Sequence, residues 1–284
     1  MTSEPDWERP ITGGHQGVLF ECGQDVCKIY SLQIGARRAR RMAAREARAL
    51  KVVEAFDDVP TPRLRGFGRF KPGWGVVMTR IRGRDFGRIV RDHPEAKLEC
   101  MRQMARLHVA VHRHPAPRLP PLKVWLAKEI RKGKVDAAFP TDTLLRRLAE
   151  LPEGDRLLHG DFHFSNVMGE PGNASIIDWP SAMRGHPAAD VCQSWLLMQR
   201  PPGEQDAMAY VRAYASESGL TVKDIFRWRA IVAGARLADN VPDEVMKAEG
   251  DRRRRSVAVR AGCSAGRPHS ASRVDLSAGQ FAAA

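Results

Sequence analysis

The sequence predicts a two-lobed α+β protein: a small antiparallel sheet lobe with one helix, followed by a larger and mainly helical lobe. Three observations support this. Strand-like runs separated by turn residues fill much of the first third, helix-forming residues dominate after about residue 83, and one strand-rich segment at 157–178 interrupts the helical part. We therefore expect a first lobe at 1–80 and a second at 81–250, meeting near Met78–Arg82.

The elements of the first third follow from local signals. Gly13-Gly14-His15-Gln16-Gly17 is expected to form a glycine loop, and Gly23-Gln24-Asp25 has the composition of a turn. The stretch from Gly35 to Phe56 is rich in Ala, Arg, Leu and Glu and contains no internal Pro or Gly, which predicts a helix. Strands are predicted at residues 18–20, 26–30, 64–70 and 75–81.

The second lobe has its clearest helical pattern at Cys100–His112. His108 and His112 lie one turn apart there, but no Glu follows His108, so we expect core packing and not a zinc pair. Residues 251–284 contain few large apolar side chains and no sustained period, and they predict a disordered basic tail.

The net charge of +13 raises the possibility of nucleic-acid binding. The excess of basic residues lies at 61–150, which contains 21 basic and 8 acidic residues. The segment 151–250 contains 9 basic and 14 acidic residues. No nucleic-acid-binding motif accompanies it, so we expect no nucleic acid as the main partner. No apolar stretch is long enough for a membrane span. The scattered cysteines and polar N-terminus suggest a cytoplasmic location, while the oligomeric state is not predicted.

The segment from His159 to Asp178 carries the chemistry. Pro171-Gly172-Asn173 predicts a turn between two short strands, and Asn166 and Asp178 are each six residues from Gly172. A hairpin centred there would bring the two side chains together as oxygen ligands of the kind that Mg²⁺ prefers. Asp161 lies in the loop before the first strand, where its carboxylate could accept a proton from a substrate hydroxyl.

A different interpretation makes the same segment a metal-dependent hydrolase. His159, Asp161 and His163 alternate, so in a strand they would share one face and could bind a metal. This hypothesis leaves Asn166 without a role and lacks a further cluster with ligand spacing.

Lys28 and Glu46 form a second candidate site. Lys28 lies inside the apolar strand at 26–30, on the same face as Val26 and Tyr30. Glu46 falls within the apolar face of the predicted helix and has no basic residue three or four positions away. A carboxylate in that position needs a cation from another element, and Lys28 is the candidate. A solvent-facing Glu46 is the alternative.

The run HGDFHFSN at 159–166, followed by IIDW at 176–179, resembles the aminoglycoside phosphotransferase and choline kinase-like family of the protein-kinase-like fold. By this resemblance Asp161 is the catalytic base, and His159 orients its loop. Asn166 and Asp178 bind Mg²⁺, and Asp190 supports the loop. The pair Lys28–Glu46 resembles the pair that steadies the ATP phosphates in kinases.

The resemblance also implies a nucleotide site. Gly13, Gly14 and Gly17 would cover phosphates, although GGHQG departs from the GxGxxG of protein kinases, and backbone near Thr79 and Ile81 would bind adenine. The expected activity is ATP- and Mg²⁺-dependent transfer of the γ-phosphoryl group to a small-molecule hydroxyl. The acidic excess at 151–250 mildly favours a cationic acceptor. A nucleotide-binding regulator without efficient transfer remains the alternative function.

Overall fold

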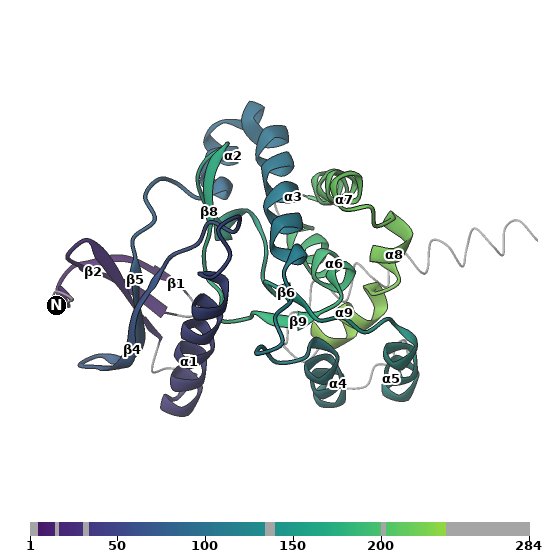
Figure 1. The fold of residues 1–284 in the computed structure, drawn as a ribbon, viewed down its shortest axis with the longest axis horizontal. Coiled ribbons are helices and arrows are strands. Elements are labelled where there is room, and N and C mark those ends of the chain that lie inside the picture. Colours follow the sequence, from purple (N-terminus) through teal and green to yellow (C-terminus); the bar gives the residue numbers. More distant parts are fainter. Residues whose placement is uncertain (1–4, 15–16, 31–33, 134–139, 200–202, 237–284) are drawn as a thin grey trace, which may run out of the picture.

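The computed structural model describes residues 5–14, 17–30, 34–133, 140–199 and 203–236, and it has the two lobes that the sequence predicts (Figure 1). The antiparallel sheet with helix α1 lies on one side in Figure 1, and the remaining helices form the larger lobe beside it. The boundaries proposed at residues 80 and 250 stay predictions. The predicted tail at 251–284 lies outside the described residues.

The first lobe contains a five-stranded antiparallel sheet in the order β1-β2-β3-β5-β4. Its strands are β1 (Pro10–Gly14), β2 (Gly17–Cys22), β3 (Asp25–Tyr30), β4 (Leu64–Phe70) and β5 (Gly73–Thr79). The central strand β3 is buried along nearly all of its length, which explains its near-continuous run of apolar residues. Lys28 therefore projects from the middle of the sheet and not from an edge.

Helix α1 (Ala36–Val53) packs on this sheet with a stripe of small and apolar residues. Its buried positions include Ala39, Ala43, Glu46, Leu50 and Val53, spaced three or four residues apart as the helical period requires. Glu46 lies within this stripe and is fully buried. The prediction that its carboxylate faces the protein interior is confirmed, and the solvent-facing alternative is wrong.

The larger lobe is built mainly from helices around one apolar core. Its helices are α2 (Phe86–Asp92), α3 (Lys97–Arg113), α4 (Leu122–Lys132), α5 (Thr141–Glu150), α6 (Pro187–Met198), α7 (Glu204–Ser218), α8 (Val222–Phe226) and α9 (Arg229–Arg236). Two short sheets complete it, formed by β6 (Arg156–Leu158) with β9 (Met183–Gly185) and by β7 (Val167–Glu170) with β8 (Asn173–Ile176). No helix among the described residues is both long and apolar enough to cross a membrane.

The predicted hairpin around Gly172 is present, but its register is shifted by one residue. Glu170 pairs with Asn173, so the turn has two residues, Pro171 and Gly172, and is not centred on Gly172. The N–H of Ile177 donates to the carbonyl of Asn166 at 2.9 Å. Asn166 therefore lies opposite Ile177, and Asp178 follows one residue later.

Two boundaries of the first lobe also differ from the predictions. The expected glycine loop is largely strand, because Gly13 and Gly14 belong to β1 and Gly14 pairs with Gly17. The last strand ends at Thr79, so Ile81 lies in the connection to the second lobe and not in the strand. Cross-strand pairing with β2 and β3 sets these limits, and local composition did not reveal it.

The paired glycines Gly68 and Gly75 give a direct test of sheet packing. A Cβ at Gly75 would lie 2.6 Å from the carbonyl oxygen of Lys28, whereas a Cβ at Gly68 would meet nothing within 4 Å. We expect Gly75→Ala to lower the free energy of unfolding by about 1–3 kcal/mol. Gly68→Ala should change it by less than about 0.5 kcal/mol or raise it slightly. Urea unfolding of both variants measures this, and equal destabilisation would contradict the register.

Candidate active site

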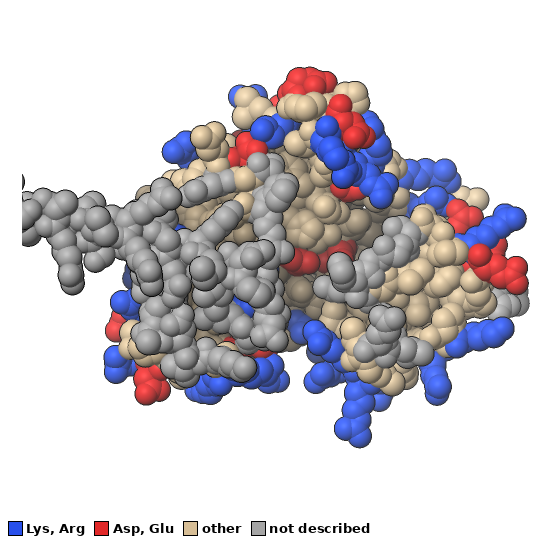
Figure 2. Space-filling model, turned by 180° about the vertical axis from the view of Figure 1, so that it is seen from behind, with Lys and Arg blue, Asp and Glu red and all other residues tan. Residues whose placement is uncertain are grey.

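A cavity of about 610 Å³ lies between the two lobes. Lys28, Glu46, Thr79, Ile81 and Asp178 all line it, although they come from distant parts of the sequence. The structure thus gathers five of the predicted site residues around one space. The space-filling view from behind shows acidic side chains in the hollow between the lobes, with Lys and Arg side chains around it (Figure 2).

Lys28 is held by two carboxylates. Its Nζ lies 3.1 Å from Oε1 of Glu46 and 2.7 Å from Oδ1 of Asp178. Glu46 also accepts a hydrogen bond from the hydroxyl of Tyr30 at 2.6 Å. Lys28 and Tyr30 are two residues apart in β3 and therefore point to the same face of the sheet, where both reach the Glu46 carboxylate. The predicted Lys28–Glu46 pair is present in the structure, and it extends to Asp178.

The charges in this group stabilise one another. Burial would lower the pKa of Lys28, but the nearby carboxylates of Glu46 and Asp178 outweigh it and raise that pKa. Burial raises the pKa of Glu46, and Lys28 opposes this. Burial would raise the pKa of Asp178, but the positive charge of Lys28 outweighs burial and holds that pKa below its usual range. The lysine is therefore cationic and Asp178 anionic, as binding of phosphate and metal requires.

The loop that carries Asp161 is fixed by backbone hydrogen bonds. Nδ1 of His159 accepts from the N–H of Asp161 at 3.2 Å, so its Nε2–H donates to the carbonyl of Ile177 at 3.0 Å. Burial lowers the pKa of His159, in agreement with this neutral tautomer. His159 thus ties the Asp161 loop to the segment just before Asp178.

Asn166 and Asp178 fit a magnesium site in their chemistry. The amide nitrogen of Asn166 donates to the carbonyl of Asp161 at 2.8 Å, which leaves its amide oxygen as the atom for a cation. Asp178 adopts φ 66°, the one positive φ among the described residues other than glycine. Such a backbone conformation is costly and is typical of functional sites. The carboxylate of Asp178 lines the cavity, and a carboxylate and an amide oxygen are the hard donors that suit Mg²⁺.

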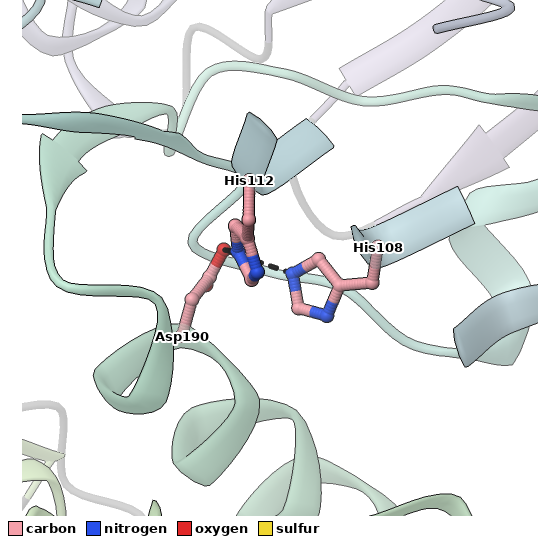
Figure 3. Close-up of side chains that lie close together, drawn as sticks. All are labelled: His108, His112 and Asp190. Carbon is pink, nitrogen blue, oxygen red and sulfur yellow. Dashed lines mark hydrogen bonds and ion pairs between the residues drawn. The ribbon is translucent and has the colours of Figure 1, made fainter. Parts of the chain in front are cut away.

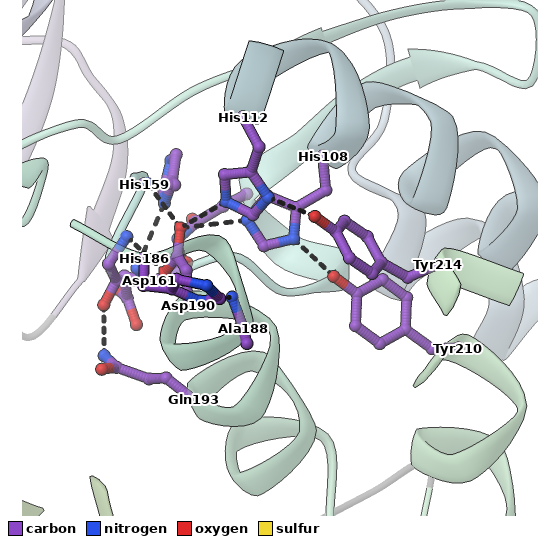
Figure 4. A network of polar contacts seen from close by, with 12 residues as sticks. His108, His112, His159, Asp161, His186, Ala188, Asp190, Gln193, Tyr210 and Tyr214 are labelled. Atoms are coloured by element: carbon purple, nitrogen blue, oxygen red, sulfur yellow. Dashed lines mark hydrogen bonds and ion pairs between the residues drawn. The ribbon is translucent and has the colours of Figure 1, made fainter. Parts of the chain in front are cut away.

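Asp190, in the first turn of α6, anchors the loop from below (Figure 4). Its carboxylate accepts from the backbone N–H groups of His159 and Gly160 at 2.7 and 2.9 Å. The rings of His108 and His112 reach the same carboxylate through Nε2 at 3.0 and 3.2 Å (Figure 3). One buried carboxylate therefore organises the catalytic loop and two turns of α3.

These three side chains lie close enough for a metal ion, and they are the one group of this kind among the described residues. Hydrogen bonding explains them without an ion. Each Nδ1 faces a tyrosine hydroxyl, Tyr210 at 2.5 Å for His108 and Tyr214 at 2.7 Å for His112. The carboxylate only accepts, so each Nε2 carries the proton and each hydroxyl donates to Nδ1. The prediction of core packing for both histidines agrees with this.

The hydrogen bonds of His159 argue against the hypothesis of a metal-dependent hydrolase. Both ring nitrogens of His159 are engaged by the backbone, and the side chain is fully buried. It could bind a metal together with Asp161 and His163 only after losing those bonds.

Sequence reasoning missed several supporting residues. Tyr30 was visible as a neighbour of Lys28 on one strand face, but its bond to Glu46 was not predicted. Gln193, whose amide donates to the carbonyl of Gly160, and the two tyrosines of α7 gave no local signal. Thr79 shows a limit of the prediction, because its N–H already donates to the carbonyl of Arg63 at 2.9 Å and cannot also bind adenine.

This geometry agrees with comparisons to known proteins. The sequence profile of the phosphotransferase enzyme family matches residues 8–230. The chain belongs to this family. The match includes β3, α1, the Asp161 loop and Asp190, so every element that contributes to the site of this phosphotransferase lies within it. A search of curated proteins finds no match.

Solved structures of aminoglycoside phosphotransferases share the fold. APH(4)-Ia matches with a TM-score of 0.62 and 18% identity, over 93% of this chain and 95% of that one. The type VIII aminoglycoside 3′-phosphotransferase matches with a TM-score of 0.56 and 20% identity, over 83% of this chain and 92% of that one. APH(3″)-Id from Streptomyces rimosus matches with a TM-score of 0.55 and 17% identity, over 80% of this chain and 91% of that one. The two-lobed protein-kinase-like fold is therefore confirmed.

The buried ion pair predicts a strong loss of stability when one partner is removed. Lys28→Met leaves Glu46 buried without its cation, and we expect the free energy of unfolding to fall by about 3–5 kcal/mol. Adding Glu46→Gln should restore part of it, because the buried group becomes neutral. Lys51→Met removes the outer partner of Glu54, where the lysine side chain is 75% exposed, and should cost less than about 1 kcal/mol. Chemical denaturation of the wild type, the two single lysine variants and the double variant measures these changes. If the double variant recovers no stability, Lys28 and Glu46 are not energetically coupled.

His108 predicts a pH dependence of stability. Burial, helped by the neighbouring His112, lowers the pKa of His108 from 6.5 to about 3. The unfolded chain therefore binds this proton first, so stability is complete above pH 6.5 and falls as the pH drops toward 3. The slope for one proton is about 1.4 kcal/mol per pH unit.

We expect His108→Gln to flatten the fall in unfolding free energy between pH 7 and 5. Tyr210→Phe is the matched control, because it removes the hydroxyl facing Nδ1 and keeps the titrating ring. It should lower stability at every pH and retain the slope. An unchanged slope in His108→Gln would show that other groups dominate.

Proposed function

We propose that this protein transfers the γ-phosphoryl group of ATP, with Mg²⁺, to a hydroxyl group of a small molecule. The observation that carries this proposal is the double ion pair of Lys28 with Glu46 and Asp178 inside the cavity between the lobes. In this ion pair a fixed cation lies beside the anionic carboxylate of Asp178, which we propose as a metal ligand. Phosphoryl transfer depends mainly on such positioning and on neutralising phosphate charge.

The nucleotide would occupy the 610 Å³ cavity. Its adenine would lie near the connection at Thr79–Ile81, and its phosphates would extend toward Lys28. Asn166 and Asp178 would hold the magnesium ion, which neutralises phosphate charge when bound. The backbone of Gly13, Gly14 and Gly17 at the β1–β2 hairpin remains our proposal for the cover of the phosphates.

Asp161 would orient the acceptor hydroxyl and accept its proton. A bond forms between the hydroxyl oxygen and the γ-phosphorus, while the bond from that phosphorus to the β–γ bridging oxygen breaks and ADP leaves. His159, Gln193 and Asp190 hold the loop through its backbone, so they position Asp161 without touching the reacting atoms.

The related structures support the nucleotide and the kind of acceptor. APH(4)-Ia has been solved with AMP-PNP and hygromycin B, and APH(3″)-Id with ADP and streptomycin. These ligands belong to those proteins. For this chain they support a nucleoside triphosphate donor and a small-molecule acceptor, and the acceptor need not be an aminoglycoside.

Asp161→Asn tests the proposed chemistry. It removes the proton acceptor with little change in shape, and we expect kcat to fall by about 10²–10⁴ while ADP affinity stays within about twofold. Asp142→Asn, at an exposed position in the first turn of α5, is the matched control and should leave kcat unchanged. Calorimetric titration with Mg·ADP and an assay of ATP consumption over an acceptor panel give both quantities. Equal turnover in Asp161→Asn and wild type would exclude Asp161 as the base, whereas Mg·ADP binding without turnover on any acceptor would leave a nucleotide-binding regulator as the better description.

A further inference from the structure

A second cavity, of about 780 Å³, lies on the other side of the Asp161 loop. His163 and Ser165 of that loop line it, and His163 Nε2 lies 3.8 Å from Oδ1 of Asp161. It shares Asp85, Arg88 and Ser165 with the nucleotide cavity, so the two spaces adjoin at the loop. A molecule in the second cavity would lie beside the proposed base. This is the position expected for the phosphate acceptor.

The wall of the second cavity formed by α2 is fixed to the catalytic loop. A Cβ at Gly87 would lie 3.1 Å from the hydroxyl of Ser165, so α2 approaches the loop as closely as a glycine permits. The N–H of Gly169 in β7 donates to the carbonyl of Arg84 at 2.9 Å. Side chains on α2 therefore keep a defined place relative to Asp161.

The charged side chains on this wall are mostly basic. Asp85 caps α2 and binds Arg88 at 3.2 Å, and Asp206 binds Lys97 at 3.0 Å. Both carboxylates are thus already neutralised by cations of the same cavity. Arg91 is left as a surplus positive charge.

Arg91 has only a weak partner of its own. Its nearest carboxylate in the described part of the chain is Asp92 at 3.9 Å, and Asp92 also binds Arg84 at 3.2 Å. The Arg91 side chain is 70% exposed and lies at the cavity wall. A guanidinium in that position can bind a carboxylate or phosphate with two parallel hydrogen bonds.

The opposite wall is apolar. Leu197 and Met198 from the end of α6 and Phe164 from the Asp161 loop line this side of the cavity. A polycationic acceptor needs unpaired carboxylates or carbonyls for each ammonium group, since unpaired buried charges are costly. Among the side chains described at this cavity, neither carboxylate is free for that purpose. An acceptor with a carbon skeleton and an anionic group fits both walls.

We infer that the phosphate acceptor is a hydroxylated small molecule bearing an anionic group, a carboxylate or a phosphate, that binds Arg91. The inference rests on the proposed phosphotransfer and narrows its acceptor. It differs from the expectation from composition, which mildly favoured a cationic acceptor and which no observation on this chain tests. The acidic excess lies at 151–250, whereas the basic wall comes from Asp85–Lys97, which precedes that segment in the sequence.

Acceptors matched in size and different in charge test this inference. Gluconate, glucose and glucosamine form a six-carbon series with an anionic, a neutral and a cationic member, and glucose 6-phosphate adds a phosphate. Binding of each to the full chain saturated with Mg·ADP is measured by calorimetry. We expect the anionic members to bind at least tenfold more tightly than the neutral or cationic ones. Equal or tighter binding of glucosamine, or no binding of either anion, would overturn the inference.

Variants at Arg91 locate the anionic group. Arg91→Gln should weaken binding of the preferred anion about tenfold or more, and Arg91→Lys should restore part of it, with Mg·ADP affinity unchanged in both. Arg102→Gln, on the exposed side of α3 and paired with Glu99, is the matched control and should change neither affinity. An unchanged anion affinity in Arg91→Gln would contradict the assignment.

The two proposals fail in different ways. ATP consumption that is independent of Asp161 would contradict the phosphotransfer proposal. Preferred binding of the neutral or cationic sugar, with ATP consumption still dependent on Asp161, would contradict the acceptor inference alone.

Discussion

The ion pairs of Lys28 are the constraint on which the site depends. A lysine in the central strand of a sheet can remain charged only if carboxylates are brought to it, and Glu46 and Asp178 come from the two different lobes. Their contact therefore couples the position of α1 to the segment that follows β8. Each buried charge would be costly without its partner, so the pairs favour the arrangement of the lobes that leaves the cavity of about 610 Å³ between them.

Asp190 has a similar part in the second lobe. Its carboxylate accepts from two backbone N–H groups of the catalytic loop and from two histidines of α3. Burial alone would raise its pKa, but the bonds from His108 and His112 keep it well below the usual range. The loop carrying Asp161 is thereby supported by rigid helices, while Asp161 itself stays partly exposed to an acceptor. Rigid support of this kind suits the role proposed for Asp161, because phosphoryl transfer depends on exact positioning of the reacting groups.

Charge is organised locally in this protein, and averages over segments hide that organisation. The basic excess at 61–150 contributes a wall of the second cavity, and the acidic excess at 151–250 includes Asp161 and Asp178 as well as buried Asp190. Counting charges along the chain gives the totals of each segment, whereas the inferred acceptor charge follows from the side chains that line one cavity. The cavity charge depends on which residues face it and on which of them already have partners.

The sequence by itself determined the two-lobed fold and the Lys28–Glu46 pair, and it singled out the loop whose catalytic role is proposed. It could do so because helical and strand periods place buried polar residues, and because a buried charge demands a partner. The sequence did not determine the register of the β7–β8 hairpin. The turn has two residues and is not centred on Gly172, so Asp178 lies one residue beyond the position opposite Asn166. Tyr30, Gln193, Tyr210 and the basic wall at Arg91 emerged only from the tertiary structure. The partners of Tyr30, Gln193 and Tyr210 are distant in sequence, so only long-range packing brings them within hydrogen-bonding distance. Arg91 was not found because packing of α2 beside the Asp161 loop decides which side chains line the second cavity.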